Sequence, residues 1–109
     1  MKYGRENIRA LNDELRTKLS GGAAVMTPGV AALGVEAVNR AIQAISVFND
    51  FCEDNDPYQE HDFGAIDIEG QKVFFKIDYY NKSLSAGSDD PSDPSITRRV
   101  LTVMLASEY

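Results

Sequence analysis

The clearest hydrophobic pattern in the chain is an alternation of period two on both sides of Glu69-Gly70. The flanking residues 63–80 are rich in β-branched and aromatic side chains, and Gly70 suits a two-residue turn because it tolerates a positive φ. The pattern predicts a β-hairpin that pairs Phe63 with Lys76. One face of this hairpin is apolar and has to be covered by helices; it consists of Ile66, Ile68, Val73, Phe75, Ile77 and Tyr79.

Two stretches show the three-to-four-residue spacing of amphipathic helices. The first runs from Arg5 to Leu19, where a serine and two glycines end it. The second runs from Val35 to about Phe51. Between them, residues 23–27 predict a short strand that adds to the sheet of the hairpin, and residues 30–33 predict a turn of helix.

The C-terminal stretch is open to two interpretations. Asp93-Pro94 resembles an N-cap followed by proline at the first helical position, which predicts a helix from Pro94 to about Ser107. Residues 100–105, VLTVML, also have the composition of a strand, but the cap favours the helix. The whole chain, residues 1–109, therefore predicts one α+β domain in the order α-β-α-β-β-α. We expect a three-stranded, mainly antiparallel sheet with helices chiefly on one face.

Negative charge is concentrated in one part of the chain. Residues 50–93 contain twelve Asp or Glu and three Lys, a balance of minus nine, whereas the whole protein carries minus six. This balance disfavours direct binding of nucleic acid, because phosphate contacts need Lys and Arg, and favours a protein partner with a basic surface. The residues that we expect to contact this partner are acidic or aromatic: Asp54, Asp56, Tyr58, Glu60, Tyr80, Asp89, Asp90 and Asp93.

A polar group on the hairpin offers an alternative, catalytic interpretation. The hairpin register places His61 opposite Asp78 and brings Lys76 and Asp62 close to them. A histidine beside a carboxylate suits general acid or base chemistry. Cross-strand ion pairs are also ordinary decoration of a solvated sheet face, and we prefer that interpretation.

The acidic segment 50–62 also raises the question of a metal. An EF-hand-like loop counted from Asp54 fails, because Tyr58, Gln59 and Ala65 occupy the fifth, sixth and twelfth places. A looser site stays open as a weaker alternative; its donors would come from Asp54, Asp56, Glu60, His61 or Asp62. We expect a solvated loop and predict no metal and no cofactor.

Compartment and covalent chemistry follow from what the sequence lacks. The N-terminal residues carry charges throughout their first turns and do not resemble a signal peptide, and no apolar run has membrane-spanning length. The single cysteine, Cys52, rules out an internal disulfide and suits a reducing compartment. We therefore expect a cytoplasmic protein that binds no membrane.

Three segments carry a resemblance to a known family. Residues 53–64 read EDNDPYQEHDFG, residues 76–81 read KIDYYN and residues 99–109 read RVLTVMLASEY. They resemble a family of small bacterial proteins of unknown function that is recognised by an END-PY-x-EHDFG segment, a KIDYYD-like strand and a C-terminal RVLTIMLAEEY-like helix. Asn81 stands here in place of the usual acidic residue. The resemblance implies a shared fold unit and assigns no activity. Members of the family are met on bacterial chromosomes and mobile elements, which suggests a role in plasmid or phage biology.

Three functional hypotheses result. The first is an interaction module that binds a basic surface of nucleic-acid-handling machinery, as an inhibitor or DNA mimic of the antirestriction or anti-CRISPR type. The second is a small enzyme that uses His61 as acid or base, Asp62 or Asp78 to orient it and Lys76 to steady an anion. The third is a homo-oligomer that assembles through the uncovered face of its sheet. We prefer the first.

Overall fold

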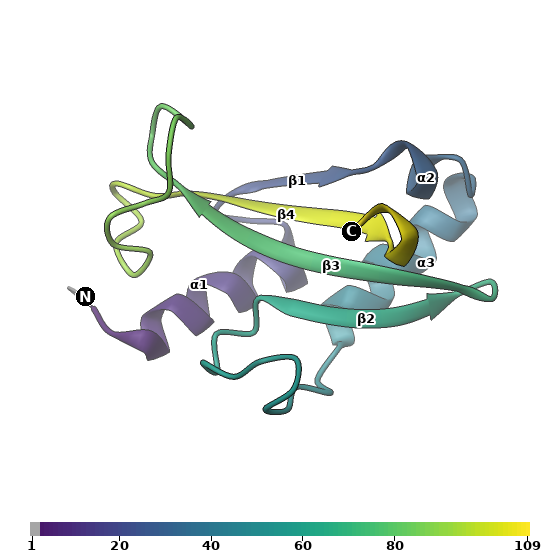
Figure 1. Cartoon of the computed structure of the whole chain (residues 1–109), viewed down its shortest axis with the longest axis horizontal. Helices are drawn as coiled ribbons and strands as arrows, with labels where there is room; N and C mark the ends of the chain where they lie inside the picture. The colour runs from purple at the N-terminus through teal and green to yellow at the C-terminus, as the bar shows by residue number, and fades with distance from the viewer. Residues whose placement is uncertain (1–2) are drawn as a thin grey trace.

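A four-stranded β-sheet with helices against one face makes up residues 3–109, the part of the chain that the computed structural model describes (Figure 1). In chain order the elements are α1 (Arg5–Lys18), β1 (Ala23–Met26), α2 (Pro28–Ala31), α3 (Val35–Val47), β2 (Phe63–Ile68), β3 (Gln71–Tyr80), β4 (Arg98–Leu105) and the short 3-10 helix η1 (Ala106–Glu108). The predicted α+β class is confirmed. The sheet has four strands in the order β1-β4-β3-β2, one more than we predicted.

The central hairpin forms in the predicted register. β2 and β3 are antiparallel, from Phe63 opposite Lys76 to Ile68 opposite Gln71. Glu69 and Gly70 both have positive φ, 53° and 81°, as a two-residue turn of type I′ requires. The backbone N–H of Ile77 donates to the carbonyl of Asp62 at 2.9 Å and extends the pairing by one step. This register places alternate residues of β3 against the helices.

The C-terminal segment is a strand and not the helix that we predicted. β4 lies in the interior of the sheet, antiparallel to β3 and parallel to β1, so that apolar residues on both of its faces are useful. Leu101 and Val103 face the helices, whereas Met104 lies opposite Phe74 and is also buried. A strand with apolar residues on both faces has no clean period of two, which is why its sequence resembles a helix. Asp93 caps a turn instead, accepting from the backbone N–H of Ser95 at 3.0 Å.

The hydrophobic core lies between the sheet and the helices α1 and α3. Its buried centre includes Leu15 of α1, Ala41 and Ile45 of α3, Phe75 of β3 and Leu101 of β4. In the part of the chain that the structure describes, no helix is both long and apolar enough to cross a membrane. Because the core lies between the sheet and the helices, the helices bury one face of the sheet and leave most of its other face without a helical cover.

α3 ends at Val47, four residues earlier than predicted, and the residues after it are used for aromatic packing. Phe48 leaves the helix with ψ of 130° and packs edge-on against Phe75, with ring centroids 5.3 Å apart. A Cβ atom at Gly64 would overlap the rings of both Phe75 and Phe48. Glycine in the EHDFG sequence is therefore required by this close approach.

Candidate functional site

The segment from Asp50 to Asp62, here called the motif loop, is ordered by its own side chains. The backbone N–H of Asp56 donates to the carbonyl of Cys52 at 2.7 Å. Asn55 spans the first half of the loop, since its Oδ1 accepts from the backbone N–H of Cys52 at 2.8 Å and its Nδ2 donates to the carbonyl of Asp50 at 2.9 Å. The loop therefore has a defined shape without any regular secondary structure.

Asp56 is the structural centre of the second half of the loop. Its Oδ1 accepts from the backbone N–H groups of Glu60, at 2.8 Å, and His61, at 3.1 Å, and the residue is only 5% exposed. Gln59 and His61 have φ of 59° and 58°, a region that side chains disfavour. The carboxylate of Asp56 offsets the cost of this strained turn, because it accepts hydrogen bonds from the backbone N–H groups that the turn buries. Asp56 was expected to contact a partner and is instead buried in the loop.

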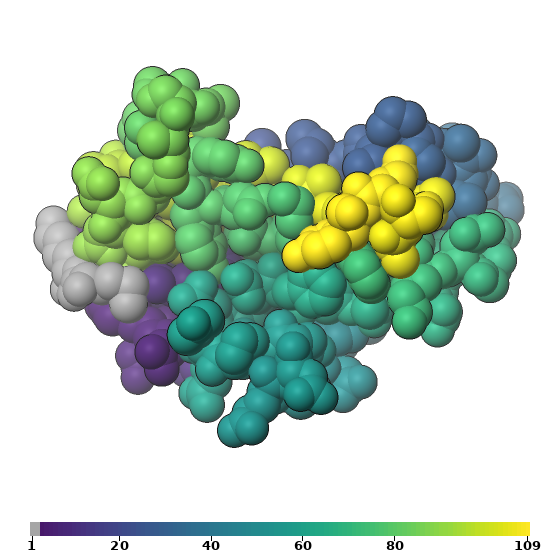
Figure 2. Space-filling model, in the orientation of Figure 1, coloured from purple at the N-terminus to yellow at the C-terminus, as the bar shows by residue number. Residues whose placement is uncertain are grey.

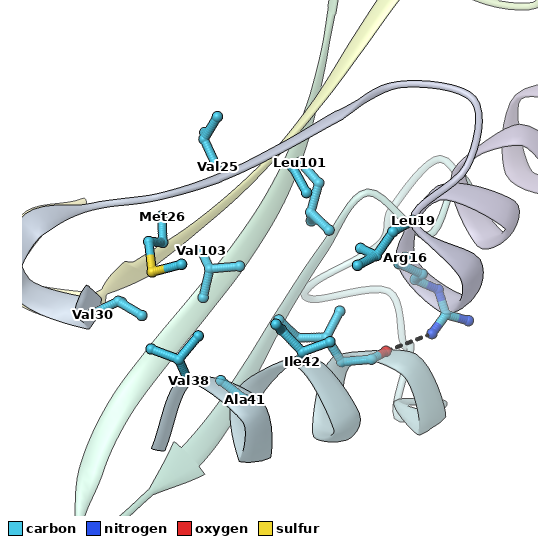
Figure 3. Close-up of a pocket in the computed structure, with 12 residues that line it drawn as sticks. Arg16, Leu19, Val25, Met26, Val30, Val38, Ala41, Ile42, Leu101 and Val103 are labelled. Carbon is cyan, nitrogen blue, oxygen red and sulfur yellow. Dashed lines mark hydrogen bonds between the residues drawn. The ribbon is translucent and has the colours of Figure 1, made fainter. Parts of the chain in front are cut away.

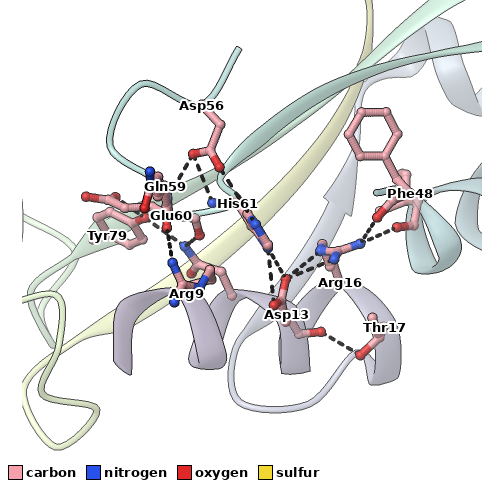
Figure 4. Close-up of polar contacts among 12 residues, drawn as sticks. Arg9, Asp13, Arg16, Thr17, Phe48, Asp56, Gln59, Glu60, His61 and Tyr79 are labelled. Atoms are coloured by element: carbon pink, nitrogen blue, oxygen red, sulfur yellow. Dashed lines mark hydrogen bonds and ion pairs between the residues drawn. The ribbon is translucent and has the colours of Figure 1, made fainter. Parts of the chain in front are cut away.

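His61 lies between two carboxylates. Its Nδ1 is 2.9 Å from Asp13 of α1, and its Nε2 is 3.8 Å from Asp56 (Figure 4). The imidazole also stacks on Phe51, with centroids 4.0 Å apart and an interplanar angle of 4°. The carboxylate of Asp13 additionally accepts from Nε of Arg16 at 2.9 Å. His61 therefore joins the motif loop to α1.

Arg16 connects the same cluster to α3. Its guanidinium is almost fully buried, and Nη1 donates to the carbonyls of Ile45 at 3.0 Å and Phe48 at 2.8 Å. These carbonyls belong to the C-terminal end of α3, where a cation satisfies acceptors that the helix leaves unpaired. On the outer side, Arg9 donates to the carbonyl of Gln59 at 3.2 Å. α1 thus holds both the end of α3 and the motif loop.

A second buried network fixes the last turn of the loop to the sheet. Nδ2 of Asn12 donates to the carbonyl of Glu60 at 3.0 Å and to Oη of Tyr79 at 2.8 Å, and Oη of Tyr79 donates to the Glu60 carboxylate at 2.7 Å. Arg99 of β4 donates from Nε to Oδ1 of Asn12 at 3.0 Å. Burial raises the pKa of Tyr79 above its usual range and lowers that of Arg99.

Sequence reasoning missed several residues of these networks, among them Asn12, Asp13, Arg16 and Arg99. Asn12 and Arg16 nevertheless left a signal in the sequence. They follow Ile8 by four and eight residues, which places them on the same side of α1 as the apolar residues Ile8 and Leu15. A polar residue within an apolar stripe indicates a buried hydrogen-bond network. Asp13 and Arg99 have no comparable local signal.

A polar hollow with a volume of about 310 Å³ lies on the outer side of the cluster. It is lined by Arg9, Phe51, Cys52, Asp56, Gln59 and His61. Nearby, burial and the charge of Glu60 raise the pKa of Asp62 to about 6. The hollow offers polar side chains of both signs beside an oriented imidazole.

The outer surface of the motif loop carries side chains that are not used to hold it. Asp50, Glu53 and Asp54 are exposed, and Tyr58 is 65% exposed. Among the described residues, no hydrogen bond or ion pair involves the side chains of Glu53 or Asp54. Figure 2 shows the loop, in teal, projecting from the lower edge of the molecule. We call these four residues the acidic platform.

The remaining residues expected to contact a partner are divided between surface and interior. Asp89 is exposed, whereas Tyr80, Glu60 and Asp90 are half-buried and Asp93 is buried. Asp90 and Asp93 accept from the backbone N–H groups of Ser92 at 3.1 Å and Ser95 at 3.0 Å, respectively. These two carboxylates therefore cap turns of the loop that leads to β4.

The structure does not assemble the polar group that we expected on the hairpin. Nζ of Lys76 pairs with Asp78 at 2.8 Å on the face of β3 opposite to Phe75 and Ile77, and this contact raises the pKa of Lys76. His61 lies on the other side of the sheet, toward α1. The predicted pairing of His61 with Asp78 is wrong, because His61 adopts positive φ and leaves the line of the strand.

The weaker alternative, a looser metal site, would draw its donors from the same acidic segment. Within residues 3–109, no three His, Cys, Asp or Glu side chains gather closely enough to hold a metal ion. Asp56 and Glu60 are instead engaged with N–H and hydroxyl donors of the protein.

Comparison with known proteins gives one match. The family model described as "Protein of unknown function (DUF3768)" matches residues 26–108, which include the motif loop and the whole hairpin. No curated protein and no solved structure matches the chain. The match begins after α1, so Asp13 and Arg16 lie outside it. The chain belongs to this DUF3768 family.

Proposed function

We propose that the protein is an interaction module that binds a basic surface of another protein through the acidic platform. One observation carries the proposal: the inward side chains of the motif loop hold its shape, while Asp50, Glu53, Asp54 and Tyr58 remain exposed on its outer side. Long loops without regular secondary structure in compact domains are usually either functional or disordered, and this one is ordered.

Rigidity and composition both favour binding at this place. A loop that is ordered before it meets its partner loses little conformational entropy on association. Carboxylates without an internal partner attract Lys and Arg side chains and speed the encounter. Tyr58 supplies an exposed aromatic ring, the residue type that most often anchors an interface. The platform thus combines an anchor with complementary charge.

The finer part of the proposal concerns the kind of partner. Proteins that handle nucleic acid carry clefts rich in Lys and Arg, which bind phosphates. The carboxylates of the acidic platform would occupy such a cleft in place of phosphates, so the protein would act in the bacterial cytoplasm as an inhibitor or DNA mimic. The overall charge of minus six supports this class of partner and disfavours direct binding of nucleic acid.

Charge reversal with a matched control tests the proposal. The platform variant replaces Asp50, Glu53 and Asp54 with Lys, and the control variant replaces Glu14, Glu36 and Asp67, which are also exposed, with Lys. Both variants change the net charge by the same amount. A bacterial protein retained by the wild type and the control but lost by the platform variant would support the proposal. Equal retention by all three proteins would contradict it.

The geometry of His61 favours a second candidate function. Asp13 orients the imidazole at 2.9 Å, and the ring lines the polar hollow beside Asp56. This arrangement suits proton transfer to a small ligand. A screen of ester and phosphate substrates with wild type and His61→Gln tests it: turnover that the variant loses, while its circular dichroism is unchanged, would support catalysis. Turnover that is equal in both proteins, or absent from both, would reject it.

A further inference from the structure

An apolar cavity with a volume of about 170 Å³ lies at the β1 edge of the sheet, between β1 and α3 (Figure 3). Its floor is formed by Leu101 and Val103 of β4, and its wall by Val38 and Ala41 of α3. We propose that this cavity is a binding site for a small hydrophobic molecule, with an apolar group about the size of one aromatic ring.

The cavity exists because small side chains meet where the helices no longer cover the sheet. β1 is the last strand at this edge and pairs only with β4. Ala24 of β1 and Ala41 of α3 both line the space, and neither side chain is long enough to fill it. Protein interiors are otherwise packed without such voids. A cavity that is maintained by two alanines is open to an added apolar group.

Exposed apolar side chains converge on the opening of the same cavity. Leu19 is 47% exposed, Met26 is 46% exposed and Ile42 is 37% exposed, and all three line it. They come from the end of α1, from β1 and from α3, so no single amphipathic element accounts for them. A cluster of exposed apolar residues around a cavity typically marks a ligand site. Met26 adds a flexible side chain that adapts to different shapes.

The lining also defines the chemical class of the ligand. Within residues 3–109, Arg16 is the only charged residue that lines the cavity, and its guanidinium already donates to Asp13, Ile45 and Phe48. The other described side chains that line the cavity are all apolar, so binding has to rest mainly on apolar contact. An engineered apolar cavity of about 150 Å³ in another protein binds benzene, which sets the scale for a single ring or a chain of about six carbons.

Titration with toluene, followed by NMR of methyl-labelled protein, tests the inference. We expect saturable shifts in the methyl groups of Ile42, Ile45, Leu101 and Val103, which surround the cavity. The variant designed to fill the cavity is Ala24→Leu, and the matched control is Ala23→Leu. Ala24 pairs with Leu101 and lines the cavity, whereas Ala23 pairs with Val100 on the other face of the same strand.

The expected result is at least a tenfold loss of toluene affinity in Ala24→Leu and an unchanged affinity in Ala23→Leu. Wild-type protein that shows no saturable shift up to the solubility of toluene would overturn the inference, whatever the variants do. Equal loss in both variants, or shifts spread over the whole protein, would also overturn it. A parallel titration with hexanoate, which carries a charged carboxylate, is a second test: hexanoate that binds more tightly than toluene would also overturn the inference.

Discussion

Nδ1 of His61 lies 2.9 Å from the carboxylate of Asp13, and this contact joins two segments that are 48 residues apart. His61 belongs to the motif loop, and Asp13 lies in the middle of α1, outside the residues that the family model matches. The relationship explains how a loop without regular structure keeps its conformation. α1 acts as the support on which the loop is built, with Arg16 and Arg9 making further contacts on the same helix.

Replacing Asp13 is expected to destabilise the protein, because this residue connects α1 to the motif loop. Asp13→Ala would leave the buried guanidinium of Arg16 without its carboxylate and His61 without the nearer of its two carboxylates, and should lower the free energy of unfolding by about 1–2 kcal/mol. Glu14→Ala, at an exposed neighbouring position, should change it by less than about 0.5 kcal/mol. Urea denaturation measures both values. Equal values for the two variants would show that the contact is not stabilising.

Asp56 should be among the least replaceable carboxylates of the motif loop. Asp56→Ala leaves the buried N–H groups of Glu60 and His61 without an acceptor and should cost about 2–3 kcal/mol. Asp56→Asn keeps an accepting oxygen and should recover part of this loss. Asp54→Ala, two residues away and exposed, serves as the control and should be nearly neutral in the same denaturation experiment. A destabilising Asp54→Ala would mean that the outer side of the loop is also structural.

The stability of the protein should depend on pH through Asp62. Its pKa is about 6 in the folded protein and 3.8 in the unfolded chain, because burial and Glu60 disfavour the carboxylate. The folded state therefore holds the proton more tightly, and the contribution of Asp62 to the free energy of unfolding falls as pH rises from about 4 to about 6.

Asp62→Asn isolates this effect. Since Asp62 is partly exposed, solvent screening reduces the expected gain at about pH 7.5 to roughly 1 kcal/mol. The gain should disappear as the pH falls toward 4. Thermal unfolding of both proteins across this range provides the measurement, and a gain that is constant with pH would assign the effect to something other than ionisation.

The hydroxyl of Tyr79 should matter, whereas that of Tyr80 should not. Tyr79→Phe removes a group that accepts from Asn12 and donates to Glu60, and should cost about 1–2 kcal/mol. Tyr80 follows it on the opposite face of β3, so Tyr80→Phe is the matched control. Hydrogen exchange at residues 59–61 should accelerate in Tyr79→Phe alone. Unchanged exchange would show that the network does not hold the loop.

What could be predicted from the sequence was local. The hairpin register follows from a period of two and from the turn at Glu69-Gly70, and both features lie within 18 residues. β4 could not be assigned in the same way, because a strand with apolar residues on both faces loses that period. Its flanking Asp93-Pro94 resembled a helix cap because aspartate accepts backbone N–H groups in turns as well as at helix ends.

In the candidate site, too, contacts between segments that are distant in the sequence could not be predicted. Asp56, Asp90 and Asp93 resemble surface charges in the sequence, yet each accepts backbone N–H groups at half-buried or buried positions. The contact between His61 and Asp13 depends on how α1 packs against the sheet, which no local pattern encodes. Asp54 and Tyr58 are exposed, as a partner-binding role requires.

Photo-crosslinking from position 58 tests the central proposal most directly. A photoreactive phenylalanine analogue replaces Tyr58 on the acidic platform or, as control, Leu84, which is 55% exposed on the loop after β3. The account predicts a discrete adduct with a basic protein from position 58, lost when Asp50, Glu53 and Asp54 are replaced by Lys, and none from position 84. An adduct that forms from position 84 alone, or that survives the charge reversal, would contradict binding through the acidic platform.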